Sequence, residues 1–200
     1  MSKAEETRDR ILDSALQLFN EQGVDKTTTN HIAAAAGISP GNLYYHYKNK
    51  EEIVRSLVAL RLQPAIDEVW QFANEPAPTF EELRSALYKH FNVFWDFRFI
   101  GDNLALMRND PIFTQGFCGI YRLRMAQFEQ MALRMQKNGI LDPQLDLATM
   151  RNLVEIGWVI TSAWLSHLEA TSTPATSEEM QRGAEMVILI LKPYMRGDNA

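Results

Sequence analysis

The chain has 200 residues, of which 46% are apolar, and a net charge of −5, so it can form one large domain or a small domain plus a larger one. An acidic chain is not a nucleic-acid binder that works through overall positive charge, and any DNA-binding surface must therefore be local. The acidity lies in the later part, because residues 1–50 carry 6 basic and 6 acidic groups and residues 51–200 carry 14 and 19.

Two helices are predicted before residue 37. Apolar residues from Ile11 to Phe19 recur at three- and four-residue spacing, which predicts a first helix with one buried face. Gly23 fits the position after the last turn of this helix, because glycine accepts the left-handed conformation that is common there. Thr28 can cap a second helix, in which Ile32 and small alanines would face inward and allow close packing.

A third helix follows a turn at residues 37–39. Ser39 can cap this helix, and Pro40 suits its first position because no amide donor is needed there. Leu43 and Tyr47 are four residues apart and therefore on one face, so they would anchor the helix to the core.

A fourth helix is predicted from Asn49, with Glu52 at the reciprocal position of a capping box. We expect Pro64 to kink or end this helix, because proline lacks the amide donor and its ring crowds the preceding turn. Residues 75–78, Glu-Pro-Ala-Pro, have the composition of a linker.

The rest of the chain is also predicted to be helical. The later helices begin at the Thr79–Glu82 capping box, at about Ile112, at Asp142-Pro143 and at the Thr176–Glu179 capping box. They end near Gly101, Gly139, Leu168 and Pro193. No alternating strand pattern with hairpin turns occurs, so we predict an all-α fold with roughly nine helices.

The segment from Lys26 to Lys50 contains no Asp or Glu, although Asp25 and Glu51 lie next to it. Such a segment on two short helices is typical of a helix-turn-helix, which places its second helix in the major groove of double-stranded DNA. Carboxylates would be repelled by the phosphates that line this groove. We therefore interpret the segment as a DNA-binding surface.

The residues of this surface divide between bases and phosphates. Pro40 and Gly41 are small enough to lie close to base edges, Asn42 can donate to and accept from adenine, and the Tyr44 ring can contact a thymine methyl. Hydroxyl, imidazole and ammonium groups, together with helix-start amides, can bind phosphates. The candidates for phosphate contact are Thr28, Thr29, Tyr45, His46 and Lys50.

The pattern T-x-x-x-I-A-x-x-A-G-I-S-x-G-x-L-Y-x-H-Y-x-x-K-E-E, from Thr28 to Glu52, resembles the N-terminal DNA-binding domain of TetR-type transcriptional regulators. The resemblance covers about residues 8–60 without gaps. It places Lys48 with the phosphate contacts and Asn30 with the base contacts. The full set of DNA-binding candidates is Thr28, Thr29, Asn30, Ser39, Pro40, Gly41, Asn42, Tyr44, Tyr45, His46, Lys48 and Lys50. Many relatives have a basic residue at position 30 or 40, and this chain does not.

The resemblance implies two domains and a homodimer. Residues 1–52 would form a three-helix DNA-binding domain with its motif at about 28–47, and residues 53–200 a helical domain for ligand binding and dimerisation. It further implies a repressor that binds a palindromic operator and is released by a small ligand. The last two helices would build the dimer interface, with Gly157, Trp164, Ala184, Val187, Ile188 and Leu191 as candidates. Burial of these residues within one chain remains the alternative.

Aromatic residues and methionines are abundant after residue 90 and are more often core than ligand contacts. As a set they suggest a cavity for a hydrophobic or aromatic small molecule. The candidates are His90, Phe91, Phe94, Trp95, Asn103, Met107, Phe117, Tyr121 and Trp158. Arg122 and His167 are further polar candidates, and no metal ligands or cofactor are expected.

Cys118 is the only cysteine, so the chain can form no intrachain disulfide, which fits a reducing cytoplasm. We expect Cys118 to be a small buried residue. The N-terminal sequence is charged rather than an apolar signal segment, and no apolar run is long enough to cross a bilayer. These features favour a cytoplasmic protein without a membrane partner.

Two other functions stay open. A helical enzyme is disfavoured because the chain has no HExxH, CxxC, phosphate-binding glycine loop or nucleophile–base signature. An architectural or division-related DNA-binding protein of the same fold would need no effector. A sizeable apolar cavity in the C-terminal part would favour the ligand-responsive regulator over that alternative.

Overall fold

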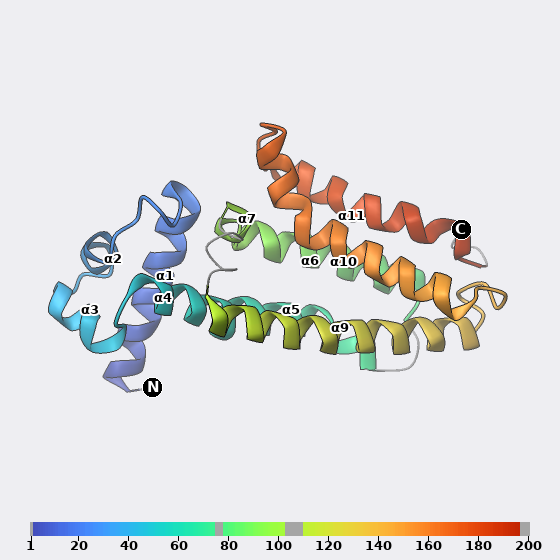
Figure 1. Cartoon of the computed structure of the whole chain (residues 1–200), viewed down its shortest axis with the longest axis horizontal. Helices are drawn as coiled ribbons and strands as arrows, with labels where there is room; N and C mark the ends of the chain where they lie inside the picture. The colour runs from blue at the N-terminus through green and yellow to red at the C-terminus, as the bar shows by residue number, and fades with distance from the viewer. Residues whose placement is uncertain (1, 75–77, 103–109, 197–200) are drawn as a thin grey trace.

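The computed structural model describes residues 2–74, 78–102 and 110–196, without the side chains at positions 74 and 102. The described residues are helical almost throughout and none lies in a β-strand, which confirms the all-α prediction. Within these ranges, no helix has both the length and the apolar character that a membrane crossing requires. Figure 1 shows a small cluster of helices at the N-terminal end of a longer helical body.

The first 57 residues form the N-terminal cluster. Its helices are α1 (Lys3–Gln22), α2 (Thr29–Ala35), α3 (Pro40–His46) and α4 (Lys50–Leu57). Their shared core contains Ile11, Leu12, Phe19, Ile32, Leu43, Tyr47, Ile53 and Leu57, all of them buried. The predicted anchoring of the third helix by Leu43 and Tyr47 is thus confirmed.

Most of the predicted helix ends are confirmed in this cluster. Gly23 follows α1 with a φ of 81°, Thr28 caps α2, and Ser39 caps α3 with Pro40 at its first position. The cap of α4 differs in one respect. The Asn49 side chain accepts the Glu52 N–H at 2.8 Å as expected, but the Glu52 carboxylate accepts from the Lys48 N–H at 2.7 Å instead of from Asn49.

The helix does not end at Pro64. A π-helical segment, Val58–Leu62, joins α4 to α5 (Gln63–Val69) without a break. The Gln63 N–H donates to the Val58 carbonyl, which closes the wider turn immediately before the proline. The extra residue of a π-turn accommodates a ring that an uninterrupted α-helix would exclude.

The C-terminal body contains the longer helices. After a 3₁₀ turn at Gln71–Asn74, they are α6 (Phe80–Asp96), α7 (Phe99–Asp102), α9 (Pro111–Lys137), α10 (Leu147–Ala170) and α11 (Ser177–Leu191), followed by a 3₁₀ turn at Lys192–Tyr194. In Figure 1, α9 and α5 run along one side of this body, and α10 and α11 lie along the other with α6.

The predicted start of α10 needs correction. The capping box at Thr79 and Glu82 is confirmed, but α10 is capped by Asp146 and not opened by Asp142-Pro143. Asp142 instead accepts an ion pair from Arg196 at 2.8 Å, so it ties the segment before α10 to the chain after α11.

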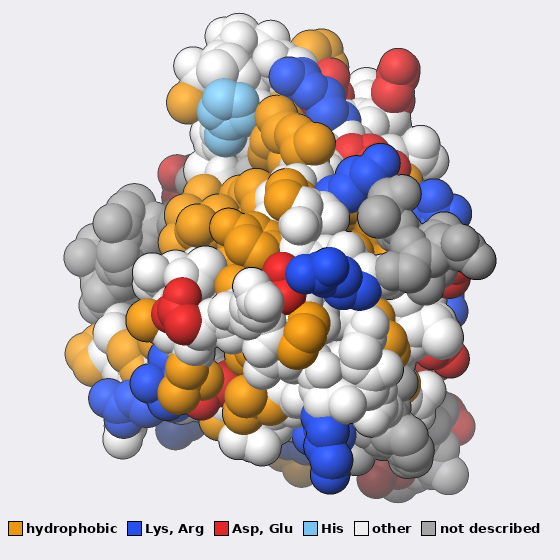
Figure 2. Space-filling model, turned by 90° about the vertical axis from the view of Figure 1, so that its right-hand side faces the viewer, with side chains coloured by type: hydrophobic (Ala, Val, Ile, Leu, Met, Phe, Trp, Pro, Cys, Tyr) orange, Lys and Arg blue, Asp and Glu red, His pale blue; other side chains and the backbone are white. Residues whose placement is uncertain are grey.

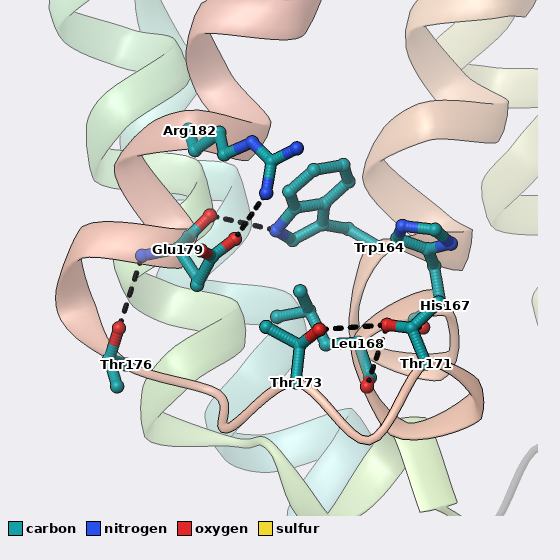
Figure 3. Close-up of polar contacts among 8 residues, drawn as sticks. All are labelled: Trp164, His167, Leu168, Thr171, Thr173, Thr176, Glu179 and Arg182. Atoms are coloured by element: carbon teal, nitrogen blue, oxygen red, sulfur yellow. Dashed lines mark hydrogen bonds and ion pairs between the residues drawn. The ribbon is translucent and has the colours of Figure 1, made fainter.

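The start of α11 has half of the predicted capping box. Thr176 accepts the Glu179 N–H at 3.2 Å, but the Glu179 carboxylate pairs with Arg182, also at 3.2 Å. The indole N–H of Trp164 donates to the Glu179 carbonyl at 2.9 Å, and the Arg182 guanidinium lies 5.9 Å from the centre of that ring. Figure 3 shows how these contacts join the end of α10 to the start of α11.

Close packing of α11 on α6 depends on Gly183. A Cβ atom at this position would lie 2.3 Å from Phe91 Cε1 and 2.8 Å from Trp164 Nε1. Phe91 is 1% exposed, so neither ring has free space to move into. The glycine therefore sets the distance between the two helices.

The N-terminal cluster contacts the body through α1 and α4. Asn20 Nδ2 donates to the Asp96 carbonyl at 2.7 Å, and the Phe99 N–H donates to Asn20 Oδ1 at 3.1 Å. Arg55 in α4 forms an ion pair with Asp110, the cap of α9, and this hydrogen bond lowers the pKa of the Asp110 carboxyl group. Both contacts hold the position of α1 and α4 relative to the longer helices.

Figure 2 views the molecule from the C-terminal end of the body, opposite to α2 and α3. Hydrophobic side chains gather across the middle of this face, and basic and acidic side chains are scattered around them. This mixture contrasts with the carboxylate-free segment at residues 26–50.

Candidate nucleic-acid interface and ligand cavity

Helices α2 and α3 meet at a tight turn that needs a glycine. Gly37 has a φ of 65°, which a residue with a Cβ adopts at a cost. The Ile38 N–H donates to the Ala33 carbonyl at 3.0 Å and fixes the turn. Ile32, Ala33 and Leu43 are buried between the helices, so the opposite faces of α2 and α3 point outward together.

The predicted DNA-binding residues lie on this outward side. Those that are exposed are Thr28, Asn30, Ser39, Pro40, Gly41, Asn42, Tyr44, Tyr45 and Lys48, whereas Thr29, His46 and Lys50 are half-buried. The Tyr44 hydroxyl and Thr29 Oγ1 are hydrogen-bonded at 3.0 Å, which links α3 to α2. Tyr44 is 52% exposed and Tyr45 81%, and aromatic side chains this accessible are not core residues.

Arg8 adds a positive charge that the sequence analysis did not identify. It is exposed on α1, and burial together with the charge of Arg8 lowers the pKa of His46. The Tyr45 ring meets the His46 ring edge-on with centres 5.2 Å apart. Arg8 precedes the buried Ile11 by three residues on α1, and helical spacing alone could not show that it lies near α3.

Lys50 has a different environment from the one expected of a phosphate contact. Its Nζ donates to the carbonyl oxygens of Val24 at 2.6 Å and Thr27 at 3.1 Å. The ammonium group therefore fastens the loop before α2 to the start of α4. One of its three N–H donors is left for another acceptor.

A largely apolar cavity of about 190 Å³ lies in the C-terminal body. Its walls come from the π-helical segment and α5, α6, α9, α10 and α11. Among the lining residues are Val58, Leu62, Trp70, Leu87, His90, Phe94, Phe113, Phe117, Arg124, Phe128, Met131, Trp158 and Val187. Apolar cavities of about 150 Å³ take up benzene, so this one has room for an organic molecule.

Four of the predicted ligand residues line this cavity: His90, Phe94, Phe117 and Trp158. Phe91, Trp95 and Tyr121 are not among the lining residues. Asn103 and Met107 lie outside the described residues.

The three described residues that do not line the cavity have contacts elsewhere. Phe91 packs under Gly183, the Arg98 guanidinium stacks over Trp95 at 4.6 Å, and the Tyr121 hydroxyl donates to Glu155 at 2.6 Å. Cys118, expected to be buried, is exposed on α9. Helical spacing alone did not show which side of each helix faces the cavity.

Two ionisable groups, those of His90 and Arg124, lie in the cavity wall. The Trp70 indole N–H donates to His90 Nδ1 at 2.9 Å, and burial, assisted by the charge of Arg124, lowers the pKa of His90 to about 3. Arg124 is 3% exposed, pairs with Asp67, and donates from an Nη to Gln127 Oε1 at 2.9 Å.

Arg122 was one of four predicted polar candidates, with His90, Asn103 and His167, but Arg122 is exposed, whereas Arg124 lines the cavity. A signal for Arg124 was present, because it falls in phase with the apolar stripe of α9. That stripe consists of Phe113, Phe117, Ile120, Phe128, Met131 and Met135, all of which line the cavity.

The six predicted dimer-interface residues have contacts within the protomer. Trp164, Ala184, Val187 and Ile188 are buried in its core, a Cβ on Gly157 would contact Val187 at 3.5 Å, and Leu191 lines the cavity. The structure therefore supports the alternative of burial within one chain for these residues. The large apolar side chains of α10 and α11 that are exposed are instead Leu147, Ile156, Val159, Met186 and Leu189.

The outward helix pair, carried on a separate cavity-containing body, is the arrangement of a helix-turn-helix transcriptional regulator. Two family models match this chain. One, described as bacterial regulatory proteins of the tetR family, covers residues 11–57, and the other, described as a bacterial transcriptional repressor, covers residues 61–200. The chain belongs to the TetR family of bacterial transcriptional regulators, which bind DNA and are not enzymes.

Named relatives agree with the family. The chain is 32% identical over 106 residues to the HTH-type transcriptional regulator AcrR of Shigella flexneri, covering 53% of this chain and 39% of that protein. It is 31% identical over 138 residues to the fatty acid metabolism regulator protein of Bacillus subtilis, covering 69% and 62%. With the first relatives, the matched part spans about a third to a half of their length.

Solved structures match nearly the whole chain. A TetR-family transcriptional regulator from Marinobacter aquaeolei VT8 has a TM-score of 0.83 at 29% identity, covering 99% of this chain and 93% of that one. The complex of SmeT with triclosan has a TM-score of 0.70 at 21% identity, covering 98% and 94%. SmeT is described as the repressor of the Stenotrophomonas maltophilia multidrug efflux pump SmeDEF.

Proposed function

We propose that this protein is a cytoplasmic repressor that binds a palindromic operator as a homodimer and leaves it when an apolar small molecule occupies the cavity. The observation that carries the DNA-binding part is the outward face of α2 and α3, which presents hydroxyl, amide, aromatic and basic groups without a carboxylate between residues 26 and 50. DNA phosphates require such a face in a chain of net charge −5.

On this proposal, α3 enters the major groove with its N-terminal end first. Gly41 and Asn42 reach the base edges, and Tyr44 reaches a thymine methyl or a base acceptor. Thr28 and Lys48 contact phosphates on either side of the groove. The hydrogen bond between Tyr44 and Thr29 fixes the angle at which the Tyr44 ring leaves α3.

The proposed DNA surface can be tested by selecting bound sequences from a random DNA pool and then titrating the recovered operator in gel shifts. A palindrome is the expected result. Tyr44→Ala should weaken operator binding by about 1–3 kcal/mol, the usual worth of a base contact. Tyr121→Ala removes the same side chain from α9, far from α3, and is the matched control. Equal binding by the two variants would contradict the assignment of Tyr44.

The proposed dimer uses the exposed apolar stripes of the last two helices. Ile156 and Val159 lie on one face of α10, and Met186 and Leu189 lie on one face of α11. Val159 is 54% exposed and Leu189 63%. Contiguous exposed apolar surface of this kind marks protein interfaces, and a twofold axis would pair the stripes with their own copies.

Light scattering of the full chain tests the dimer. The unaltered protein should have the mass of two chains, and Val159→Asp with Leu189→Asp should reduce it to one, because a buried unpaired carboxylate is costly. Leu123→Asp is the control, since Leu123 is equally exposed but lies on α9. A mass of one chain for the unaltered protein would refute the proposal.

The cavity supports the effector part of the proposal over an effector-independent DNA-binding protein of the same fold. Its walls are almost wholly apolar, and SmeT, a structural neighbour, is solved with triclosan bound. Adding apolar organic compounds to the operator complex should release DNA in gel shifts. If no compound that binds the protein changes its operator affinity, the effector-independent function is favoured.

A further inference from the structure

The mostly apolar wall of the cavity contains two ionisable side chains, His90 and Arg124, besides the uncharged Gln63, Thr161 and Ser162. His90 from α6 and Arg124 from α9 line the cavity together with Trp70, which follows α5. They are close enough for the charge of Arg124 to lower the pKa of His90. Two polar groups brought from separate helices into an apolar cavity are the usual way in which a binding site orients its ligand.

Arg124 has more donors than partners. A guanidinium group carries five N–H bonds, and here one Nη donates to Gln127 and the other pairs with Asp67. Its Nε is buried and has no hydrogen-bond partner among the described residues. A buried donor without an acceptor is costly, so the guanidinium group of this cavity-lining residue is not fully satisfied by the protein.

His90 adds a second donor. Because Nδ1 accepts the Trp70 N–H at 2.9 Å, the neutral ring carries its proton on Nε2 and can donate only from there. The ring stays neutral near pH 7 because its pKa is about 3. His90 therefore offers a hydrogen bond without adding a second positive charge beside Arg124.

The ion pair of Arg124 is asymmetric. Arg124 is almost fully buried, whereas the side chain of Asp67 is 57% exposed and also accepts from Gln63 at 2.9 Å. The carboxylate of Asp67 can turn into water at little cost, but the guanidinium group cannot. An incoming anion could therefore replace Asp67 on the same guanidinium group and leave the number of ion pairs unchanged.

We propose that the cavity binds an apolar monocarboxylate, with its carboxylate on Arg124 and His90 and its hydrocarbon or aromatic body against the surrounding rings and methionines. This assignment rests on the proposed function, because it names the chemical class of the effector. A planar guanidinium group matches a carboxylate with two parallel hydrogen bonds. An amine would meet the charge of Arg124 and be repelled.

Calorimetric titration of the full chain with three matched probes tests the assignment. The probes are 4-phenylbutanoate, 4-phenylbutanamide and 4-phenylbutylamine, which share the apolar body and differ in the head group. We expect the acid to bind at least tenfold more tightly than the amide, and the amine not to bind. Equal affinities for acid and amide would overturn the proposal.

Substitutions at and near Arg124 test where the carboxylate of the bound acid lies. Arg124→Met should weaken binding of the acid at least tenfold and change binding of the amide less than threefold. Arg122→Met removes the same charge from the exposed side of α9 and should change neither. Asp67→Asn should strengthen acid binding, because it removes the competing carboxylate without altering a cavity residue. Weaker acid binding by Asp67→Asn would contradict the exchange of ion pairs.

Gel shifts with the same probes separate this inference from the proposed function. If 4-phenylbutanoate binds through Arg124 but leaves operator affinity unchanged, the assignment of the cavity stands and effector release is refuted. If a neutral apolar compound releases DNA and the acid neither binds nor competes, the proposed function stands and the carboxylate assignment is refuted. Should Arg124→Met fail to fold, Arg124→Lys together with Asp67→Asn tests the same contact.

Discussion

Asn20 in α1 and Phe99 in α7 are joined across the two parts of the molecule by a hydrogen bond from the Phe99 N–H to Asn20 Oδ1, at 3.1 Å. The side-chain amide of Asn20 also donates from Nδ2 to the Asp96 carbonyl at 2.7 Å. The ring of the neighbouring Phe19 lies 5.5 Å from the ring of Phe99. The Asn20 side chain thus bonds both the carbonyl of Asp96, at the end of α6, and the N–H of Phe99, at the start of α7.

Asn20→Ala should lower the free energy of unfolding by about 1–3 kcal/mol, because it removes two hydrogen bonds and leaves the Phe99 N–H without this acceptor. It should also reduce the effect of a bound ligand on operator affinity, since α1 would be held less firmly to α7. Urea unfolding and gel shifts measure the two effects. Gln17→Ala is the control on α1, where the lost bond to Glu21 is exposed. Equal losses in both variants would exclude a special role for Asn20.

Gly183→Ala should destabilise the protein by about 1–3 kcal/mol through overpacking. The added methyl group would lie within 3.0 Å of Phe91 and Trp164, so α11 would have to move away from α6. Gly119→Ala tests helix propensity alone, because nothing lies within 4 Å of a Cβ there, and it should stabilise by about 0.5–1 kcal/mol. Thermal unfolding of the two variants should therefore give shifts of opposite sign.

His90 should make stability depend on pH in the acidic range. Its folded-state pKa of about 3 lies below the ordinary value of 6.5, so between these values the unfolded chain binds a proton that the folded chain does not. Stability should therefore fall as the pH drops below 6.5, by up to about 1.4 kcal/mol per pH unit. His90→Asn should flatten the profile in urea unfolding from pH 4 to 7.

The two lysines after α3 should behave differently. Lys50→Ala removes the hydrogen bonds to the Val24 and Thr27 carbonyls, so it should lower both thermal stability and DNA affinity. Lys48→Ala should leave stability within about 0.5 kcal/mol, as surface substitutions usually do, and should reduce the salt dependence of DNA binding by about one unit. A stable Lys50→Ala variant would show that these bonds contribute little.

The helix ends could be predicted from the sequence because a cap involves only neighbouring residues. Thr28 and Ser39 accept the amide of the residue three positions later, and that geometry follows from residue type and spacing. The predicted helix start at Asp142 was wrong because residue type alone suits Asp142 to a cap, whereas the residue that holds it, Arg196, is distant in sequence.

The wall of the cavity was harder to predict because it depends on which helix faces which. His90, Phe94, Phe117 and Trp158, which were predicted from residue type, do line the cavity. Phe91 has the same character as Phe94, but it faces α11 because Gly183 brings that helix close. For the predicted dimer interface, periodicity selected residues of α10 and α11 that pack within the chain, and the two sides of these helices can be told apart only in the folded structure.

The π-helical segment Val58–Leu62 connects α4 of the N-terminal cluster to α5 of the cavity-containing body. Leu57 is fully buried in the N-terminal core, and Val58, the next residue, already lines the cavity. A π-turn holds one more residue than an α-turn, so this segment adds one residue after Leu57 while Leu62 and Ile66 still face the cavity. A molecule in the cavity that displaces Val58 must also shift Leu57, because a peptide bond joins the two residues. The cavity-containing body and the N-terminal cluster therefore meet at the single peptide bond between Leu57 and Val58.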